Sequence, residues 1–103
     1  MEILDKLYIN DDFTPKEINN IMLNLSKRKN YLDVFCICFE EGSKYPLEML
    51  ESKEIIKDIY DDKHYIIVGI SRSEEKALEI IKEIIDKTYH KYGDVYKVNE
   101  LFL

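Results

Sequence analysis

The thirty residues HYIIVGISRSEEKALEIIKEIIDKTYHKYG, numbered 64–93, make up the stretch that decides the fold class. Residues 65–70 form an apolar run in which both alternating sets of side chains are apolar, and this predicts a strand covered on both faces. The polar turn Ser71-Arg72-Ser73 comes next, and an amphipathic helix follows over 74–92. Gly93 then ends the helix, because glycine adopts the left-handed conformation common there at little cost. A strand, a turn and a helix in this order form half of a βαβ unit.

A complete helix-start signal lies close to the N-terminus. Thr14 is a favoured N-cap residue, Pro15 suits the first helical position, and Glu17 completes a capping box. Apolar residues then recur at helical spacing, at positions 18, 21, 22 and 25. The pattern predicts a helix that begins at Pro15 and ends near Arg28, where a basic run suits the negative end of the helix dipole.

Three strands and one helix complete the predicted order of elements. The pattern over 32–39 predicts a strand with two apolar faces, and shorter strands are predicted at 7–9 and, as an edge strand, at 95–98. Residues 47–60 are predicted as a helix in which Ser52 is a candidate break. The apolar residues 101–103 are expected to pack against the sheet.

The chain is therefore expected to be a single α/β domain over 1–103, with the order β-α-β-α-β-α-β. Helices between successive strands favour parallel pairing, so the prediction is a mostly parallel four-stranded sheet with 32–39 and 65–70 at its centre. Two arrangements of the helices stay open. Either the helices cover both faces of the sheet, or they pack on one face and a second subunit covers the other.

Charge and cysteine content narrow the classes of partner and location. The formal net charge of −6 disfavours nucleic acid and anionic membrane as partners, because both need a basic field. The sequence shows no long apolar run and no signal peptide, so a cytoplasmic location is expected. Cys36 and Cys38 lie two apart in a predicted strand, and we interpret them as buried apolar side chains rather than as a disulfide, a redox pair or metal ligands.

The carboxyl ends of the strands are the predicted ligand-binding edge, as in open α/β sheets generally. The turn 71–73 suits an anion at the start of the last helix, although it suits an ordinary helix cap as well. The acidic loops suit a divalent cation, although 11–12 is equally typical of a loop that enters a helix. No catalytic residue, metal site or cofactor is predicted. The candidate ligand-binding residues are Asp11, Asp12, Glu40, Ser71, Arg72 and Ser73.

The segments Ile67-Val68-Gly69-Ile70-Ser71 and 75–81 (EKALEII) resemble a stretch found in small bacterial proteins of about this length, to which no activity is assigned. The resemblance covers mainly residues 65–93. It implies a small α/β domain of the cytosol, and it implies no site.

Two functions are compatible with this sequence. The first is a non-enzymatic interaction or regulatory module whose partner is a second copy, as a homodimer, or another protein. It rests on the doubly apolar strands and on the eight tyrosines, a residue type favoured at interfaces, among them Tyr89, Tyr92 and Tyr96 around Gly93. The alternative is a domain that binds a small molecule or an anion in the crevice at the strand ends, with enzymatic activity left open.

Overall fold

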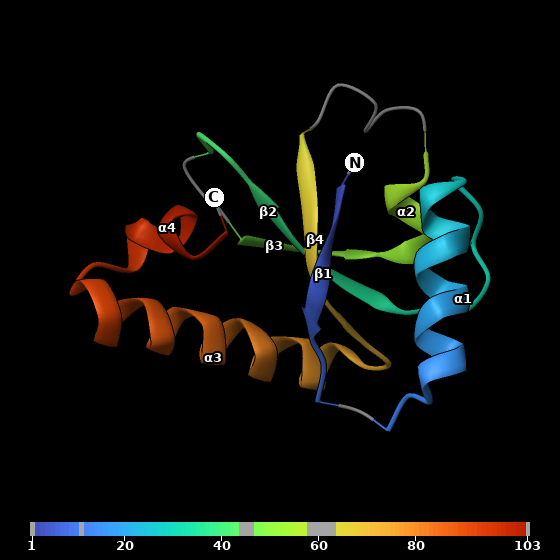
Figure 1. Cartoon of the computed structure of the whole chain (residues 1–103), viewed down its shortest axis with the longest axis horizontal. Helices are drawn as coiled ribbons and strands as arrows, with labels where there is room; N and C mark the ends of the chain where they lie inside the picture. Colours follow the sequence, from blue (N-terminus) through green and yellow to red (C-terminus); the bar gives the residue numbers. More distant parts are fainter. Residues whose placement is uncertain (1, 11, 44–46, 58–63, 103) are drawn as a thin grey trace.

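A four-stranded sheet with helices on both sides forms the structure, a computed structural model that describes residues 2–10, 12–43, 47–57 and 64–102 (Figure 1). The strands are β1 (Glu2–Tyr8), β2 (Phe35–Glu40), β3 (Leu47–Glu51) and β4 (Tyr65–Ser71). The helices are α1 (Pro15–Ser26), α2 (Ser52–Ile55), α3 (Glu74–Tyr92) and α4 (Asn99–Phe102), and α4 is preceded by the 3-10 helix η2 (Val95–Val98).

The sheet is mixed rather than mostly parallel. Its strand order is β1-β4-β2-β3, with β1 parallel to β4 and with β2 antiparallel to both of its neighbours. The predicted mixture of helices and a four-stranded sheet is confirmed, and so are the central positions of β2 and β4. The predicted mostly parallel arrangement and the order β-α-β-α-β-α-β are wrong, because two segments differ from their predicted secondary structure.

The first of these segments is 47–51, which was expected to be helical and is the edge strand β3. All five of its residues pair with β2, from Leu47 opposite Phe39 to Glu51 opposite Phe35. Leucine, glutamate and methionine favour helices in isolation. Here the ladder to a buried central strand outweighs that weak preference, as tertiary pairing often does. The helix α2 begins only at Ser52, the predicted break.

The second segment is 95–98, which was expected to be an edge strand and instead forms η2. The Asp94 side chain accepts a hydrogen bond from Tyr96 N at 2.9 Å, which caps the turn and directs the chain back toward the sheet. Val98 is buried there, and the ring of Phe102 packs 5.5 Å from that of Phe39. The expected packing of the C-terminal apolar residues is therefore confirmed for 101–102, whereas Leu103 lies outside the described residues.

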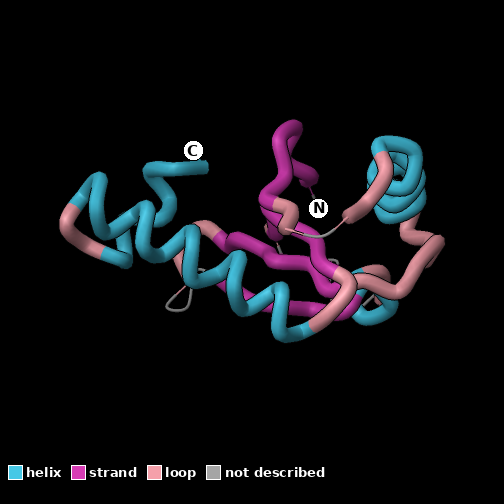
Figure 2. The backbone as a smooth tube through the Cα atoms, turned by 90° about the horizontal axis from the view of Figure 1, so that it is seen from below, coloured by secondary structure: helices cyan, strands magenta, loops and turns pink. Residues whose placement is uncertain are grey.

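Helices cover both faces of the sheet, as Figures 1 and 2 show from two directions. On one face α1 and α2 bury a core that includes Ile21, Cys36 and Ile67. On the other face α3, η2 and α4 pack over a second core that includes Phe39 and Ile80. Of the two arrangements left open by the sequence, the structure therefore has the one in which a single chain covers both faces.

The close approach of β1 to β4 depends on Gly69. Tyr8 pairs with Gly69, and a Cβ atom on Gly69 would lie 2.9 Å from the Tyr8 carbonyl oxygen and 3.3 Å from Ile80 Cγ2. The register to β2 also shifts here, since Cys38 pairs with Ile67 but its neighbour Ile37 pairs with Gly69. The ladder is therefore irregular at this point, and a residue without a side chain lets the end of β1 approach β4 closely.

The substitution Gly69→Ala is expected to lower the free energy of unfolding by about 1–3 kcal/mol, because the methyl group meets backbone and core atoms that cannot move aside. Urea denaturation followed by circular dichroism measures the change. Gly42→Asn is the matched control, since Gly42 has a positive φ that asparagine tolerates and no atom within 4 Å of its would-be Cβ. Equal, small losses in both variants would contradict the packing role of Gly69.

Candidate functional site

Parallel β1 and β4 bring four of the predicted site residues to one edge of the sheet. Asp12 follows β1, and the turn Ser71-Arg72-Ser73 joins β4 to α3. Arg72 Nη2 donates to Glu17 Oε2 at 2.8 Å, and its Nε lies 3.8 Å from Asp12 Oδ1. The guanidinium carbon also lies 4.3 Å from the centroid of the Phe13 ring. Arg72 therefore ties the entry of α3 to the entry of α1.

Glu40 does not belong to this cluster. It pairs with Tyr65, the first residue of β4, at the opposite edge of the sheet. The prediction that Glu40 joins the other site residues is wrong, because it requires β2 to run parallel to β4, and an antiparallel β2 ends at the other edge. Asp11 lies outside the described residues.

The two serines of the turn build the start of α3. Ser73 Oγ accepts a hydrogen bond from Lys76 N at 3.2 Å, as an N-cap does. Ser71 Oγ donates to the Ser73 carbonyl oxygen at 3.0 Å and accepts from Ser73 N at 3.3 Å. Of the two interpretations of this turn, the geometry favours the helix cap over an anion site.

The electrostatics of the cluster are those of a matched ion pair. The hydrogen bond from Arg72 lowers the pKa of the Glu17 carboxyl, and the Thr14 backbone N–H adds to the effect. Glu17 thus serves the capping box of α1 and holds Arg72 at the same time. Because two carboxylates already neutralise the positive charge of Arg72, it would attract an additional anion only weakly.

A small cavity of about 150 Å³ adjoins Arg72. Its charged residues are two acidic and two basic, and Lys53 Nζ lies 3.4 Å from Glu51 Oε2. The cavity is smaller than the roughly 300 Å³ at which small-molecule sites begin. The lining residues are Asp33, Val34, Phe35, Glu51, Ser52, Lys53 and Arg72.

A larger groove of about 390 Å³ lies between β1, α3 and α4. In Figure 1, α3 and α4 lie to the left of β1, and α4 folds back toward the sheet. Sequence reasoning missed this groove because its walls come from three distant segments, and no local motif marks it. The lining residues are Leu4, Lys6, Leu7, Tyr8, Ile9, Glu83, Lys87, Leu101 and Phe102.

Exposed apolar side chains gather on α3 and the turn after it. Of the seven large hydrophobic residues exposed in the described part of the chain, five lie between 78 and 96. Tyr89 and Tyr96 are 57% and 72% exposed, whereas Tyr92 is half-buried. Two of the three tyrosines expected at a contact surface thus reach solvent.

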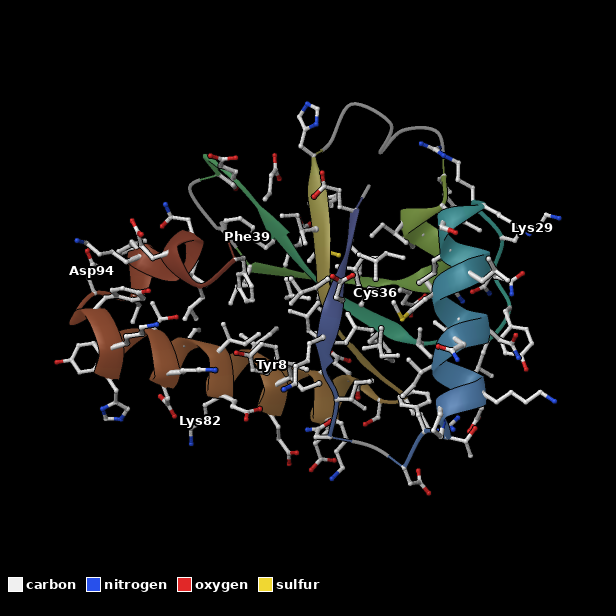
Figure 3. All side chains as sticks on the ribbon, viewed as in Figure 1. Tyr8, Lys29, Cys36, Phe39, Lys82 and Asp94 are labelled. Atoms are coloured by element: carbon white, nitrogen blue, oxygen red, sulfur yellow. The ribbon has the colours of Figure 1, made fainter. Side chains whose placement is uncertain are left out.

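The two cysteines are free thiols inside the core on the α1 side of the sheet, as Figure 3 shows for Cys36. Burial raises the pKa of the Cys36 thiol to about 12 and raises the pKa of Cys38 well above its usual range, which makes both poor nucleophiles. Among the described residues, no three His, Cys, Asp or Glu side chains come together as metal ligands would.

Comparison with known proteins adds no relative. The chain matches no protein-family model, and neither curated proteins nor solved structures give a match. The resemblance noted over 65–93 stays a prediction. None of the helices in the described ranges combines the length and apolar character needed to cross a bilayer.

The substitution Arg72→Gln is expected to raise the pKa of Glu17 toward its ordinary value, because the hydrogen bond from the guanidinium is the main cause of the lowering. In the native protein this interaction stabilises the fold above the unfolded-state pKa of the carboxyl and is lost as pH falls through the folded-state pKa. An NMR titration of the Glu17 carboxyl carbon measures the shift.

The matched control is Arg28→Gln, which removes the chain's other arginine at the far end of α1. It should leave the titration of Glu17 unchanged. A pKa of Glu17 that moves equally in both variants would show that Arg72 has no specific role.

Proposed function

We propose that this chain is a non-enzymatic interaction module that associates with a second copy of itself through the outer flank of α3. The observation that carries the proposal is a stripe of exposed apolar residues on that helix. Leu78, Ile85 and Tyr89 are 52%, 37% and 57% exposed. We refer to these three residues as the α3 stripe.

The spacing of the α3 stripe suits helix-to-helix packing. Steps of seven and four residues keep the three side chains within about 40° of one another around the helix, at about 100° per residue. Half-buried Ile81 and Tyr92 lie between the stripe and the buried face. The apolar surface of α3 is therefore continuous from the core outward, as in helices that pair along one seam.

The charges beside the α3 stripe favour a second copy as the partner. Lys82 and Asp86 are one turn apart on the solvent side, and Figure 3 shows Lys82 projecting away from the sheet. If two α3 helices pair antiparallel about a two-fold axis near residue 84, Lys82 of each copy lies opposite Asp86 of the other. Leu78 then lies close to Tyr89 of the other copy. Such self-complementarity is what a two-fold interface requires.

The remaining features of the chain are consistent with a role inside the cell. Two buried free thiols suit a reducing compartment, which supports the cytoplasm as the proposed location. The net charge of −6 disfavours nucleic acid as a partner. The alternative function, an anion-binding crevice at the strand ends, has less support because Arg72 is shared there by Glu17 and Asp12.

The substitution Ile85→Glu is expected to abolish self-association, because it places a charge in the centre of the α3 stripe. Sedimentation velocity over a concentration series from about 1 μM to 1 mM measures the mass, bracketing the affinity expected of a small interface. As the concentration rises, the measured mass of the native protein should increase from that of one 12.3 kDa chain toward that of two chains. The mass of the variant should stay at that of one chain.

Leu23→Glu is the matched control, since Leu23 is 53% exposed on α1, at the other side of the sheet. It should associate as the native chain does. The paired substitutions Lys82→Asp and Asp86→Lys should each weaken association and together restore it. The proposal is overturned if the native chain keeps the mass of a single chain at every concentration, or if Leu23→Glu and Ile85→Glu have equal effects on association.

A further inference from the structure

We propose that the groove between β1, α3 and α4 binds a small amphipathic carboxylate, an acyl or aryl acid of about eight to ten carbon atoms. Its carboxylate would lie at Lys87 and Tyr8, and its apolar part along Leu4 and Phe102. The proposal does not depend on self-association. Lys87 lies roughly 160–200° around α3 from the residues of the α3 stripe, so the two surfaces are separate.

The apolar part of the groove is continuous with the core. Leu4, Tyr8, Leu101 and Phe102 are half-buried and all pack on the cluster beneath α3. The Phe102 ring meets the Tyr8 ring edge-on, with centroids 6.3 Å apart. Figure 3 shows Tyr8 between β1 and α3 and Phe39 on the same side of the sheet. These residues form a preshaped apolar wall, as ligand sites commonly have.

The polar end of the groove is built around Lys87. Its Nζ donates to the Tyr8 hydroxyl oxygen at 3.1 Å and lies 5.5 Å from the centroid of the Tyr8 ring. A lysine is charged at neutral pH, and the hydrogen bond with Tyr8 raises the pKa of Lys87 further. The lysine is thus positioned by a neighbour that can itself donate its hydroxyl hydrogen to a carboxylate.

The charge of the groove is opposite to that of the chain as a whole. Two lysines, Lys6 and Lys87, and one carboxylate, Glu83, line it, which leaves one positive charge in excess. The chain carries −6 overall. A local excess of positive charge on an acidic protein favours an anion at this place.

The size and lining of the groove favour a carboxylate with an apolar body over other anions. The apolar side chains on the groove face are Leu4, Leu101 and Phe102, together with the ring of Tyr8, whereas Leu7 and Ile9 line the groove but pack against the core on the α1 face. A phosphate or a nucleotide would place further charge and polar atoms against these side chains without partners. A volume of about 390 Å³ lies within the usual range for a single small ligand.

NMR titration of the ¹⁵N-labelled full chain tests the proposal with four probes: octanoate, 4-phenylbutyrate, octan-1-ol and acetate. Octanoate and 4-phenylbutyrate should shift amides of β1, 83–87 and 101–102 and saturate with a dissociation constant of about 0.1–1 mM. Octan-1-ol, which lacks the charge, and acetate, which lacks the apolar body, should bind at least about tenfold more weakly, since each loses one of the two contacts.

Variants locate the carboxylate. Lys87→Gln should weaken the binding of octanoate about tenfold and leave the dissociation constant of octan-1-ol unchanged, because the substitution removes only the charge. Lys16→Gln is the matched control, since Lys16 is exposed on α1 beyond the opposite face of the sheet. The proposal is overturned if no probe gives saturating shifts by about 5 mM, if acetate binds as well as octanoate, or if the two lysine variants behave alike.

Discussion

The antiparallel ladder between β2 and β4 is the interaction on which the rest of the structure depends. Cys36, Ile37, Cys38 and Phe39 of β2 are almost wholly buried, as are Ile67 and Ile70 of β4. Because apolar side chains project from both faces of this pair of strands, each face needs a covering layer. The chain supplies α1 and α2 for one layer, and α3 with the C-terminal turns for the other. Both faces of the sheet are thus covered, and five of the seven exposed large hydrophobic side chains in the described residues lie between 78 and 96.

The direction of β2 also decides which polar residues meet. Antiparallel pairing sends Glu40 to the far edge and leaves Asp12 and Arg72 together at the near edge. There the polar groups are used by the fold itself, since Arg72 joins two helix entries and the hydroxyl of Ser73 caps α3. An arginine shared by two carboxylates and an aromatic ring stabilises a junction between elements. The polar residues at these strand ends thus stabilise the junction between α1 and α3, at a position where many α/β proteins bind ligands.

The helix α3 separates two kinds of surface. One flank carries the α3 stripe, and the flank about half a turn away carries Glu83 and Lys87 beside β1. Gly69 contributes to this arrangement, because the close approach that it permits brings Tyr8 toward α3, where its hydroxyl meets Lys87. The C-terminal turns complete the groove by returning over the sheet. An exposed apolar stripe and a groove lined by two lysines therefore coexist around a helix of nineteen residues.

The sequence by itself determined the elements that local physics controls. The capping box at Thr14 and Glu17, the N-cap at Ser73 and the glycine at 93 define α1 and α3, and runs of residues that are apolar on both faces define β2 and β4. Only the tertiary structure decided that residues 47–51 form a strand, how residues 95–102 fold, and that β2 runs antiparallel to β4. A segment of leucine, glutamate and methionine becomes a strand when a buried neighbour offers hydrogen bonds along its full length, and this information lies elsewhere in the chain. For the same reason Glu40 was misplaced and the groove was missed, since residues from three distant segments meet there only after the sheet has formed.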